Sequence, residues 1–296
     1  MSNAGGLPPL VTVALPVYNA GRHLRLAIAS IVRQTFTDWE LLVLDDGSSD
    51  GALDHLTQEL GDSRIKVLRD GCNMGIAVRL NQAVDLARGQ YFARMDADDI
   101  SFPERFARQV AALQADGTLD LVATRAITVD EFNHVSGSFP YALSHADICA
   151  RPWLGFHLPH PTWMGKTEWF RSHRYTVPAP YLCEDQELLL RTYRSSRFTT
   201  IDEVLFAYRV NTSIDWHRFP KIRRAMAKYQ LRYFVRSGQW HFAVMALLAL
   251  PVKRCLDQWR QWTCDPHLPK THGISTEMEH HWRGVLQRVA DDPRAS

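Results

Sequence analysis

The sequence has no continuous apolar run of the roughly 18–20 residues that a membrane-spanning helix needs, so we expect no integral membrane protein. It also lacks a surplus of either charge, because 34 Lys and Arg offset 32 Asp and Glu to give a net charge of +2. Proteins that bind nucleic acids usually carry a much larger basic surplus, so we expect no nucleic-acid partner. The five cysteines include no Cys-x-x-Cys pair, which disfavours disulfide frameworks and zinc knuckles and fits a reducing, cytoplasmic location.

Glycine-rich phosphate loops are missing as well. No Gly-x-x-x-x-Gly-Lys-Ser/Thr motif occurs, and no Gly-x-Gly-x-x-Gly follows the first expected strand. These absences count against a P-loop protein and against a dinucleotide-dependent oxidoreductase. We interpret residues 1–8 as a tag scar and a disordered N-terminus, with no signal peptide before the first strand.

Short apolar runs alternate with helical patterns through the first 100 residues. We expect strands at 10–15, 40–44, 65–68 and 90–95, and helices at 22–34, about 51–60 and 75–88, the last ending at Gly89 as its C-cap. Strands that alternate with helices indicate βαβ units. The expected fold is therefore α/β, with a mostly parallel sheet and helices on both faces.

The pattern is looser after residue 103. We expect helices at 104–115 and 184–194, strands at 119–123 and 127–129, and an irregular binding loop at 137–165, which is rich in Pro, His and aromatic residues. Residues 221–236 carry six cations and no acid, which predicts an amphipathic basic helix ended by Ser237-Gly238. The stretch 240–251 is almost wholly apolar but too short to span a membrane.

Polar clusters follow three of the expected strands, at 16–19, 45–50 and 96–99. Ligands of parallel α/β sheets bind outside the carboxyl ends of the strands, so these clusters should converge on one crevice. In the third cluster, three carboxylates within four residues repel one another unless a cation or hydrogen-bond donors intervene. Hard divalent cations prefer such oxygen ligands, so the cluster predicts a metal site, although a solvated acidic turn would give the same pattern.

Four further residues are candidate site residues, and three of them have a second interpretation from the sequence alone. Tyr18 could form an aromatic wall for a nucleobase or simply pack after its strand, and Gly75 could bring backbone close to a phosphate. Glu184 and Asp185 could include a general base, or could be acids favoured in the first turn of a helix by its dipole.

Taken together and in order, these motifs resemble glycosyltransferase family 2. The matching residues are Pro16-Val17-Tyr18-Asn19, Ser30-Ile31, Gln34-Thr35, 40–50, Asn73-x-Gly75, Asn81, 89–99, Pro103-Glu104-Arg105, His160-Pro161-Thr162 and Glu184-Asp185. Each motif is modest alone, but their ordered occurrence over about residues 9–212 is highly specific. The resemblance implies a GT-A fold and a metal-dependent, inverting transfer of a sugar. The donor would be a nucleotide sugar, expected to be a UDP-sugar, and the acceptor a glycan or lipid-linked molecule in polysaccharide biosynthesis.

The resemblance also implies roles for individual residues. The nucleotide sugar would be bound by Pro16, Tyr18, Asn19, Asp46, Gly75 and Asp96. Asp98 would bind Mn²⁺ or Mg²⁺, and Asp185 would be the catalytic base. His160, Glu184 and Asn211 would lie in the acceptor region or support it. One departure concerns Tyr208-Arg209-Val210-Asn211, where relatives often have Tyr-Arg-x-His, so the strength or identity of the metal is left open.

The same resemblance divides the chain. Residues 9–215 would form the GT-A domain, with a nucleotide-binding half at about 9–100 and an acceptor half at about 101–215, and 216–296 would form a mainly helical extension. Within that extension, 221–262 could contact the inner face of the cell membrane peripherally, pack on the catalytic domain, or form a dimer contact.

Two other functions stay open at this point. One is a nucleotidyltransferase, which would usually need a glycine-rich basic loop after the first strand, where only Arg22 and Arg25 supply charge. The other is a non-catalytic relative that binds nucleotides or sugars, which the intact Asp98 and Asp185 disfavour.

Overall fold

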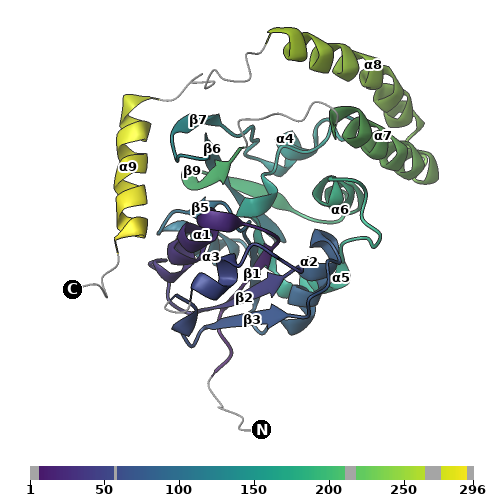
Figure 1. The fold of residues 1–296 in the computed structure, drawn as a ribbon. Helices are drawn as coiled ribbons and strands as arrows, with labels where there is room; N and C mark the ends of the chain where they lie inside the picture. The colour runs from purple at the N-terminus through teal and green to yellow at the C-terminus, as the bar shows by residue number, and fades with distance from the viewer. Residues whose placement is uncertain (1–6, 57–58, 211–217, 264–274, 292–296) are drawn as a thin grey trace.

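The computed structural model describes residues 7–56, 59–210, 218–263 and 275–291, and in it a mixed sheet separates two layers of helices (Figure 1). The described residues form nine strands in the order β3-β2-β1-β4-β8-β6-β9-β5, with β7 paired to β6. The strands are β1 Val11–Val17, β2 Trp39–Asp45, β3 Ile65–Arg69, β4 Tyr91–Arg94, β5 Ile100–Ser101, β6 Leu121–Val129, β7 Val135–Ser138, β8 Met164–Lys166 and β9 Phe198–Arg209.

Strands β1 to β4 are mutually parallel where they pair, and β6 and β9 are parallel to each other. Strand β8 is antiparallel to both β4 and β6, so it joins the two parallel parts. The α/β class expected from the sequence is confirmed, and the four strands predicted in the first 100 residues all lie in this sheet.

The helices are α1 Leu24–Val32, α2 Ile76–Leu86, α3 Arg105–Ala115, α4 His145–Cys149, α5 Thr167–Ser172, α6 Glu184–Thr192, α7 Arg218–Arg236, α8 Trp240–Thr263 and α9 Thr276–Ala290. Apolar residues of α1 and α3 pack on one face of the sheet, and those of α2, α5 and α6 pack on the other. Alternate side chains of a strand point to opposite faces, so β1 contributes Val13 to the first core and Ala14 to the second.

The last three helices attach at two places. Helices α7 and α8 form a hairpin that joins the second core through Phe234, Ala243 and Ala246. Helix α9 packs Trp282 and Val285 against β5 and β9 in a third core (Figure 1). The basic helix predicted over 221–236 is confirmed as α7. Within the described ranges, no helix combines the length and apolar character needed to cross a membrane.

Four local predictions differ from the structure. The helix expected at about 51–60 is replaced by short 3₁₀ turns at Ala52–His55 and Glu59–Gly61. Gly51 has a positive φ of 70°, and Asp50 accepts hydrogen bonds from the backbone N–H groups of Gly21 and Ala52, which together favour a turn.

Gly89 does not cap the preceding helix, because α2 ends at Leu86. A Cβ at Gly89 would lie 2.5 Å from the backbone nitrogen of Thr12, so glycine is required by the close approach to β1. The expected strands at 119–123 and 127–129 are one continuous strand, β6. The expected irregular segment 137–165 contains the short helix α4 and the start of β8.

Candidate active site

The loops after β1 and β2 are fastened to each other at the carboxyl edge of the sheet. The backbone N–H of Asn19 donates to Ser48 Oγ at 3.1 Å, and the backbone N–H of Ser49 donates to Asn19 Oδ1 at 2.8 Å. Pro16 lies near the end of β1, and Tyr18, directly after that strand, is 57% exposed. Asn19 therefore holds the shape of this edge, whereas the Tyr18 ring is accessible to a ligand.

Asp46 is buried, and its carboxylate is fully engaged by the chain itself. Its Oδ1 accepts from Met74 N at 2.7 Å and from Arg79 Nε at 2.9 Å, and its Oδ2 accepts from Gly75 N at 2.9 Å. Gly75 has a φ of +87°, a conformation that L side chains rarely adopt, and it precedes the first turn of α2. In the structure, Asp46 fixes the loop that carries Gly75.

The acidic turn after β4 is tied to the end of β9. Asp96 pairs with the buried Arg94 at 2.5 Å, and Asp99 Oδ1 accepts from the backbone N–H of Arg209 at 2.7 Å. The Arg209 guanidinium donates to the backbone oxygen of Asp98 at 2.7 Å. Arg209 thus anchors the turn, and Asn211, two residues further on, lies outside the described residues.

The negative charge of this turn is only partly neutralised. Burial, followed by the charge of Asp96, raises the pKa of Asp98 to about 6. Burial also raises the pKa of Asp99 well above its ordinary value, and Asp99 Oδ2 is buried without a partner in the described residues. No described side chain donates a hydrogen bond to the Asp98 carboxylate. Oxygen ligands with unsatisfied charge are what Mg²⁺ and Mn²⁺ require, so the turn fits a divalent cation.

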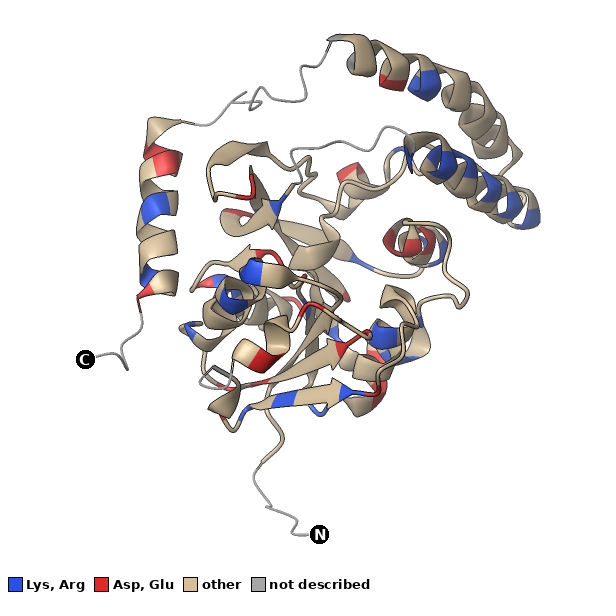
Figure 2. Cartoon of the chain, viewed as in Figure 1, with Lys and Arg blue, Asp and Glu red and all other residues tan. Residues whose placement is uncertain are grey.

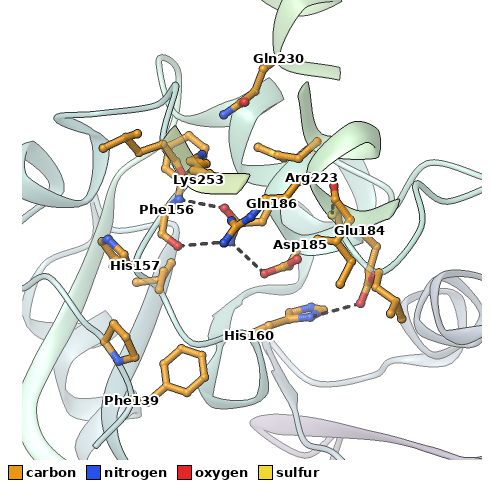
Figure 3. A pocket seen from close by; sticks show the side chains of 18 of the residues that line it. Phe139, Phe156, His157, His160, Glu184, Asp185, Gln186, Arg223, Gln230 and Lys253 are labelled. Carbon is orange, nitrogen blue, oxygen red and sulfur yellow. Dashed lines mark hydrogen bonds and ion pairs between the residues drawn. The ribbon is translucent and has the colours of Figure 1, made fainter. Parts of the chain in front are cut away.

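A cavity of about 620 Å³ opens beside this edge (Figure 3). Four of the predicted site residues line it, namely Asp96, His160, Glu184 and Asp185. Arg94 and Tyr208 contribute from β4 and β9, and the far wall comes from the α7–α8 hairpin, with Arg223 and Lys253. The neighbouring Ile76 also lines the cavity, but Gly75 and Asp98 are not in its wall.

Glu184 and Asp185 reach the cavity because α6 begins at Glu184. Buried Leu188, Leu189 and Leu190 anchor α6 in the second core, and acids in a first turn interact favourably with the helix dipole. Burial, followed by the charge of Asp185, raises the pKa of Glu184 to about 7. Burial also raises the pKa of Asp185, but a hydrogen bond from Gln186 favours its charged form. The charge of this pair is therefore incomplete near neutral pH, where Glu184 titrates.

Gln186 connects Asp185 to the loop that contains Phe156. Its Nε2 donates to Asp185 Oδ2 at 3.0 Å and to the backbone oxygen of Phe156 at 3.2 Å. Its Oε1 accepts from the backbone N–H of Phe156 at 2.8 Å (Figure 3). A Cβ at Gly155 would lie 2.9 Å from Gln186 Oε1, so the glycine makes room for this contact.

His160 is buried and neutral. Burial, followed by the charge of Arg94, lowers its pKa well below the ordinary value. Its Nε2 lies 2.8 Å from Tyr175 Oη, and its Nδ1 lies 3.8 Å from Glu184 Oε1. His160, Glu184 and Asp185 also offer ligand atoms within 4.8 Å of one another, so within the described chain they form a second possible cation site.

The cavity residues that were not predicted as site residues from the sequence include Arg94, Gln186, Arg223 and Lys253. Burial alone would lower the pKa of Arg94, but the charges of Asp96 and nearby acids outweigh burial and raise it. Burial, followed by the charge of Arg223, lowers the pKa of Lys253 to about 8. The excess of cations over 221–236 was a signal for Arg223, but only the tertiary structure brings Gln186 and Lys253 to the cavity.

The model of Glycosyl transferase family 2 matches residues 12–174, more than half of the chain. EpsE of Bacillus subtilis, named as a glycosyltransferase, is 32% identical over 206 residues, covering 68% of this chain and 73% of EpsE. WfgD of Escherichia coli, named as a UDP-Glc:α-D-GlcNAc-diphosphoundecaprenol glucosyltransferase, is 38% identical over 104 residues, covering 35% of this chain and 41% of WfgD. The chain belongs to glycosyltransferase family 2, which confirms the resemblance seen in the motifs, and it is a glycosyltransferase.

Solved structures agree on the fold. TarS of S. aureus in complex with UDP-GlcNAc superposes with a TM-score of 0.61 at 17% identity, covering 94% of this chain and 81% of that structure. The mannosyltransferase PcManGT of Pyrobaculum calidifontis, in complex with GDP-Man and Mn²⁺, gives 0.59 at 17% identity, covering 95% and 85%. These likenesses establish a GT-A-like fold for this chain.

Proposed function

We propose that the protein is an inverting glycosyltransferase that transfers a sugar from a UDP-sugar to a glycan or lipid-linked acceptor in polysaccharide biosynthesis. The observation that carries this proposal is the position of Asp185, which lies in the cavity wall and is held by Gln186. An acceptor hydroxyl is a poor nucleophile, so transfer needs a base within hydrogen-bond reach. A hydrogen bond from the Gln186 amide supports the charged form of the Asp185 carboxylate.

In the proposed reaction, Asp185 takes the proton of the acceptor hydroxyl while that oxygen bonds to the anomeric carbon. The bond from that carbon to the diphosphate oxygen breaks, and the electron pair leaves with the nucleotide diphosphate. Base and leaving group stand on opposite sides of the carbon, so one displacement inverts its configuration. Glu184, whose pKa is raised to about 7, is partly protonated near neutral pH and so adds less than a full negative charge beside the base.

The donor would lie along the carboxyl edge of the sheet, with the Tyr18 ring against its nucleobase and the Gly75 loop near its phosphates. Asp98, with Asp96 beside it, would hold Mn²⁺ or Mg²⁺, and this assignment is supported by the incompletely neutralised charge of the turn. Such an ion would stabilise the charge that develops on the leaving diphosphate. Similar folds bind UDP-GlcNAc in TarS and GDP-Man in PcManGT, so the fold alone does not select the nucleobase. We propose uracil because the names of WfgD and of the TarS complex both give a UDP-sugar.

A lipid-linked acceptor is supported by the far wall of the cavity. Arg223 and Lys253 bring positive charge there, and Leu250 and Met226 bring apolar surface. This combination suits an acceptor that carries a phosphate next to a lipid chain, as the name of WfgD describes for that enzyme. The cysteine pattern supports a cytoplasmic site for the reaction.

The test is a panel of UDP-, GDP- and dTDP-sugars with Mn²⁺, each combined with undecaprenyl-diphosphate-linked sugars and with free oligosaccharides. We expect release of one nucleotide diphosphate per sugar transferred, with an inverted linkage by NMR. Failure of every donor to bind or react would overturn the catalytic proposal and favour a non-catalytic relative. The family match already favours a glycosyltransferase over the nucleotidyltransferase alternative.

A further inference from the structure

One side of α8 exposes a continuous row of large apolar side chains. We define the apolar face of α8 as Trp240, Val244, Leu247, Leu248, Val252, Leu256 and Trp262, which are all exposed. Trp240 and Leu248 are each 62% exposed and Trp262 is 91% exposed. Most neighbours in this set are three or four residues apart, which places the set on one side of the helix. At about 1.5 Å per residue the face is about 33 Å long.

The opposite side of α8 packs against the rest of the molecule. Ala243 and Ala246 are buried in the second core, and Asp257 pairs with Arg223 of α7 at 3.1 Å. Lys253 Nζ donates to the backbone oxygen of Leu154 at 3.0 Å. The orientation of α8 is therefore fixed by contacts with the rest of the molecule, so the apolar face cannot turn inward. Contiguous apolar patches of this kind are rare on monomeric soluble proteins and mark interaction sites.

The charge of the neighbouring helix identifies the partner. Helix α7 contains no acidic residue and exposes Lys221, Arg224, Lys228, Arg232 and Arg236. Figure 2 shows these cations as a blue row along α7, next to the mostly tan α8. A second copy of the chain meeting this one through α8 would bring two such rows close together, and like charges repel. An anionic surface would instead attract the cations.

We propose that the apolar face of α8 inserts into the interface of an anionic lipid bilayer, while the cations of α7 are attracted to its acidic headgroups. Tryptophan at both ends of the face, Trp240 and Trp262, suits the boundary between headgroups and acyl chains. A helix with an apolar face and adjacent cations lies in the plane of the membrane surface. Docking in this way needs no membrane-spanning segment.

The docking hairpin is also the far wall of the catalytic cavity. Met226 of α7 and Ala246 and Leu250 of α8 line that cavity from the side opposite their exposed surfaces. A bilayer bound to α8 would thus lie one helix away from the cavity. This link to a lipid-linked acceptor rests on the proposed function, whereas the docking itself does not.

The test is co-sedimentation of the full chain with two kinds of vesicle, one of phosphatidylcholine alone and one that also contains about 30% phosphatidylglycerol. Each is measured at low and at high salt. We expect binding to the anionic vesicles that weakens roughly tenfold or more at high salt, since screening removes the attraction of headgroups for α7. The double variant Leu248→Asp, Val252→Asp should lose binding, and Lys228→Gln, Arg232→Gln should weaken it on anionic vesicles only. Leu86→Asp, an exposed leucine of α2, is the matched control and should bind like the wild type.

Light scattering and circular dichroism accompany each variant. Absence of binding by the folded wild type to anionic vesicles at low salt would overturn the proposal, as would full binding by the Leu248→Asp, Val252→Asp variant. A wild-type dimer that this variant converts to a monomer would instead make the face a contact between copies. Vesicle binding requires neither donor nor acceptor, and titration with UDP and Mn²⁺ reports the catalytic site separately, so the two proposals can fail independently.

Discussion

The amide nitrogen of Gln186 lies 3.0 Å from the carboxylate of Asp185 and donates a hydrogen bond to it. The same amide makes two hydrogen bonds with the backbone of Phe156, so Gln186 cannot rotate without breaking them. A carboxylate held in this way has a fixed direction, and general-base catalysis depends on that geometry. Gln186 is therefore a positioning residue for the proposed base.

We expect Gln186→Met to lower kcat about tenfold, which is less than the loss expected on removing the base itself, and to leave the KM for the donor unchanged. Removing a hydrogen bond to the charged form of Asp185 raises its pKa, so the acid limb of the rate profile should move to higher pH. The measurement is kcat between pH 5 and 9. An unshifted limb would mean that Gln186 only supports the loop at Phe156.

Asp185→Asn should lose transfer by a factor on the order of 10² or more, because asparagine has the same shape but cannot accept the proton. Nucleotide binding should persist, as shown by titration with UDP and Mn²⁺. Asp202→Asn is the matched control, since Asp202 is an exposed acid of β9 that pairs with Arg125 and does not line the cavity. Transfer at the wild-type rate by Asp185→Asn would make this residue a helix-start acid only.

The variant Glu184→Gln distinguishes the role of Glu184 from that of Asp185. Glutamine reproduces the protonated form of Glu184, whose pKa is raised to about 7, so below pH 7 the variant should keep transfer within about threefold of wild type. A base works only when unprotonated, so the rate still rises with pH through the raised pKa of Asp185. The wild-type profile should show an additional change near pH 7 that the variant lacks. A hundredfold loss at pH 6 would assign the base to Glu184 instead.

Much of the fold followed from local patterns, whereas the cavity depended on contacts between distant segments. The strands that end at Val17, Asp45 and Arg94 are apolar runs stopped by polar clusters, so their positions and shared edge were predictable. Strand β9 was missed because exposed Asp202 and Glu203 interrupt its apolar pattern, where its register with β6 also shifts.

The two acids of the proposed site, Glu184 and Asp185, were predicted from the family motifs, but their environment was not. The contact of Gln186 with Phe156 joins residues 30 positions apart, and the cavity wall formed by α7 and α8 comes from outside the family match. No local periodicity records such contacts. The sequence also could not reveal that the chain itself occupies both oxygens of Asp46.

Two variants distinguish the two possible cation sites. If the ion is held by the acidic turn, Asp98→Asn should remove most of the Mn²⁺ dependence of UDP binding, because the turn loses its unengaged carboxylate. His160→Gln should then change that dependence little, since an ion held by the turn would not contact His160, whose Nε2 is engaged by Tyr175. Isothermal titration with UDP, with and without Mn²⁺, measures both. The reverse result would place the ion at His160, Glu184 and Asp185 and remove Asp185 as the base.

Replacement of Asp46 or of Tyr18 should weaken UDP binding, but for different reasons. Asp46→Ala removes the anchor of the Gly75 loop and leaves the buried Arg79 with only Asp70 as its charged partner. Breaking a buried ion pair costs about 3–5 kcal/mol, and the remaining Asp70 pair should keep the loss of unfolding free energy near the lower end of that range.

Tyr18→Ala should leave the free energy of unfolding unchanged within about 0.5 kcal/mol, because its ring is mostly exposed and substitutions at such sites have small effects. Its UDP affinity should fall roughly tenfold, since a base that stacks on an aromatic ring gains about 1–3 kcal/mol. Urea unfolding and UDP titration on the same samples measure the two quantities. If Tyr18→Ala binds UDP as tightly as the wild type, Tyr18 is not part of the nucleoside pocket. If the Asp46→Ala protein is as stable as the wild type, the hydrogen bonds of Asp46 to the Gly75 loop are dispensable for folding.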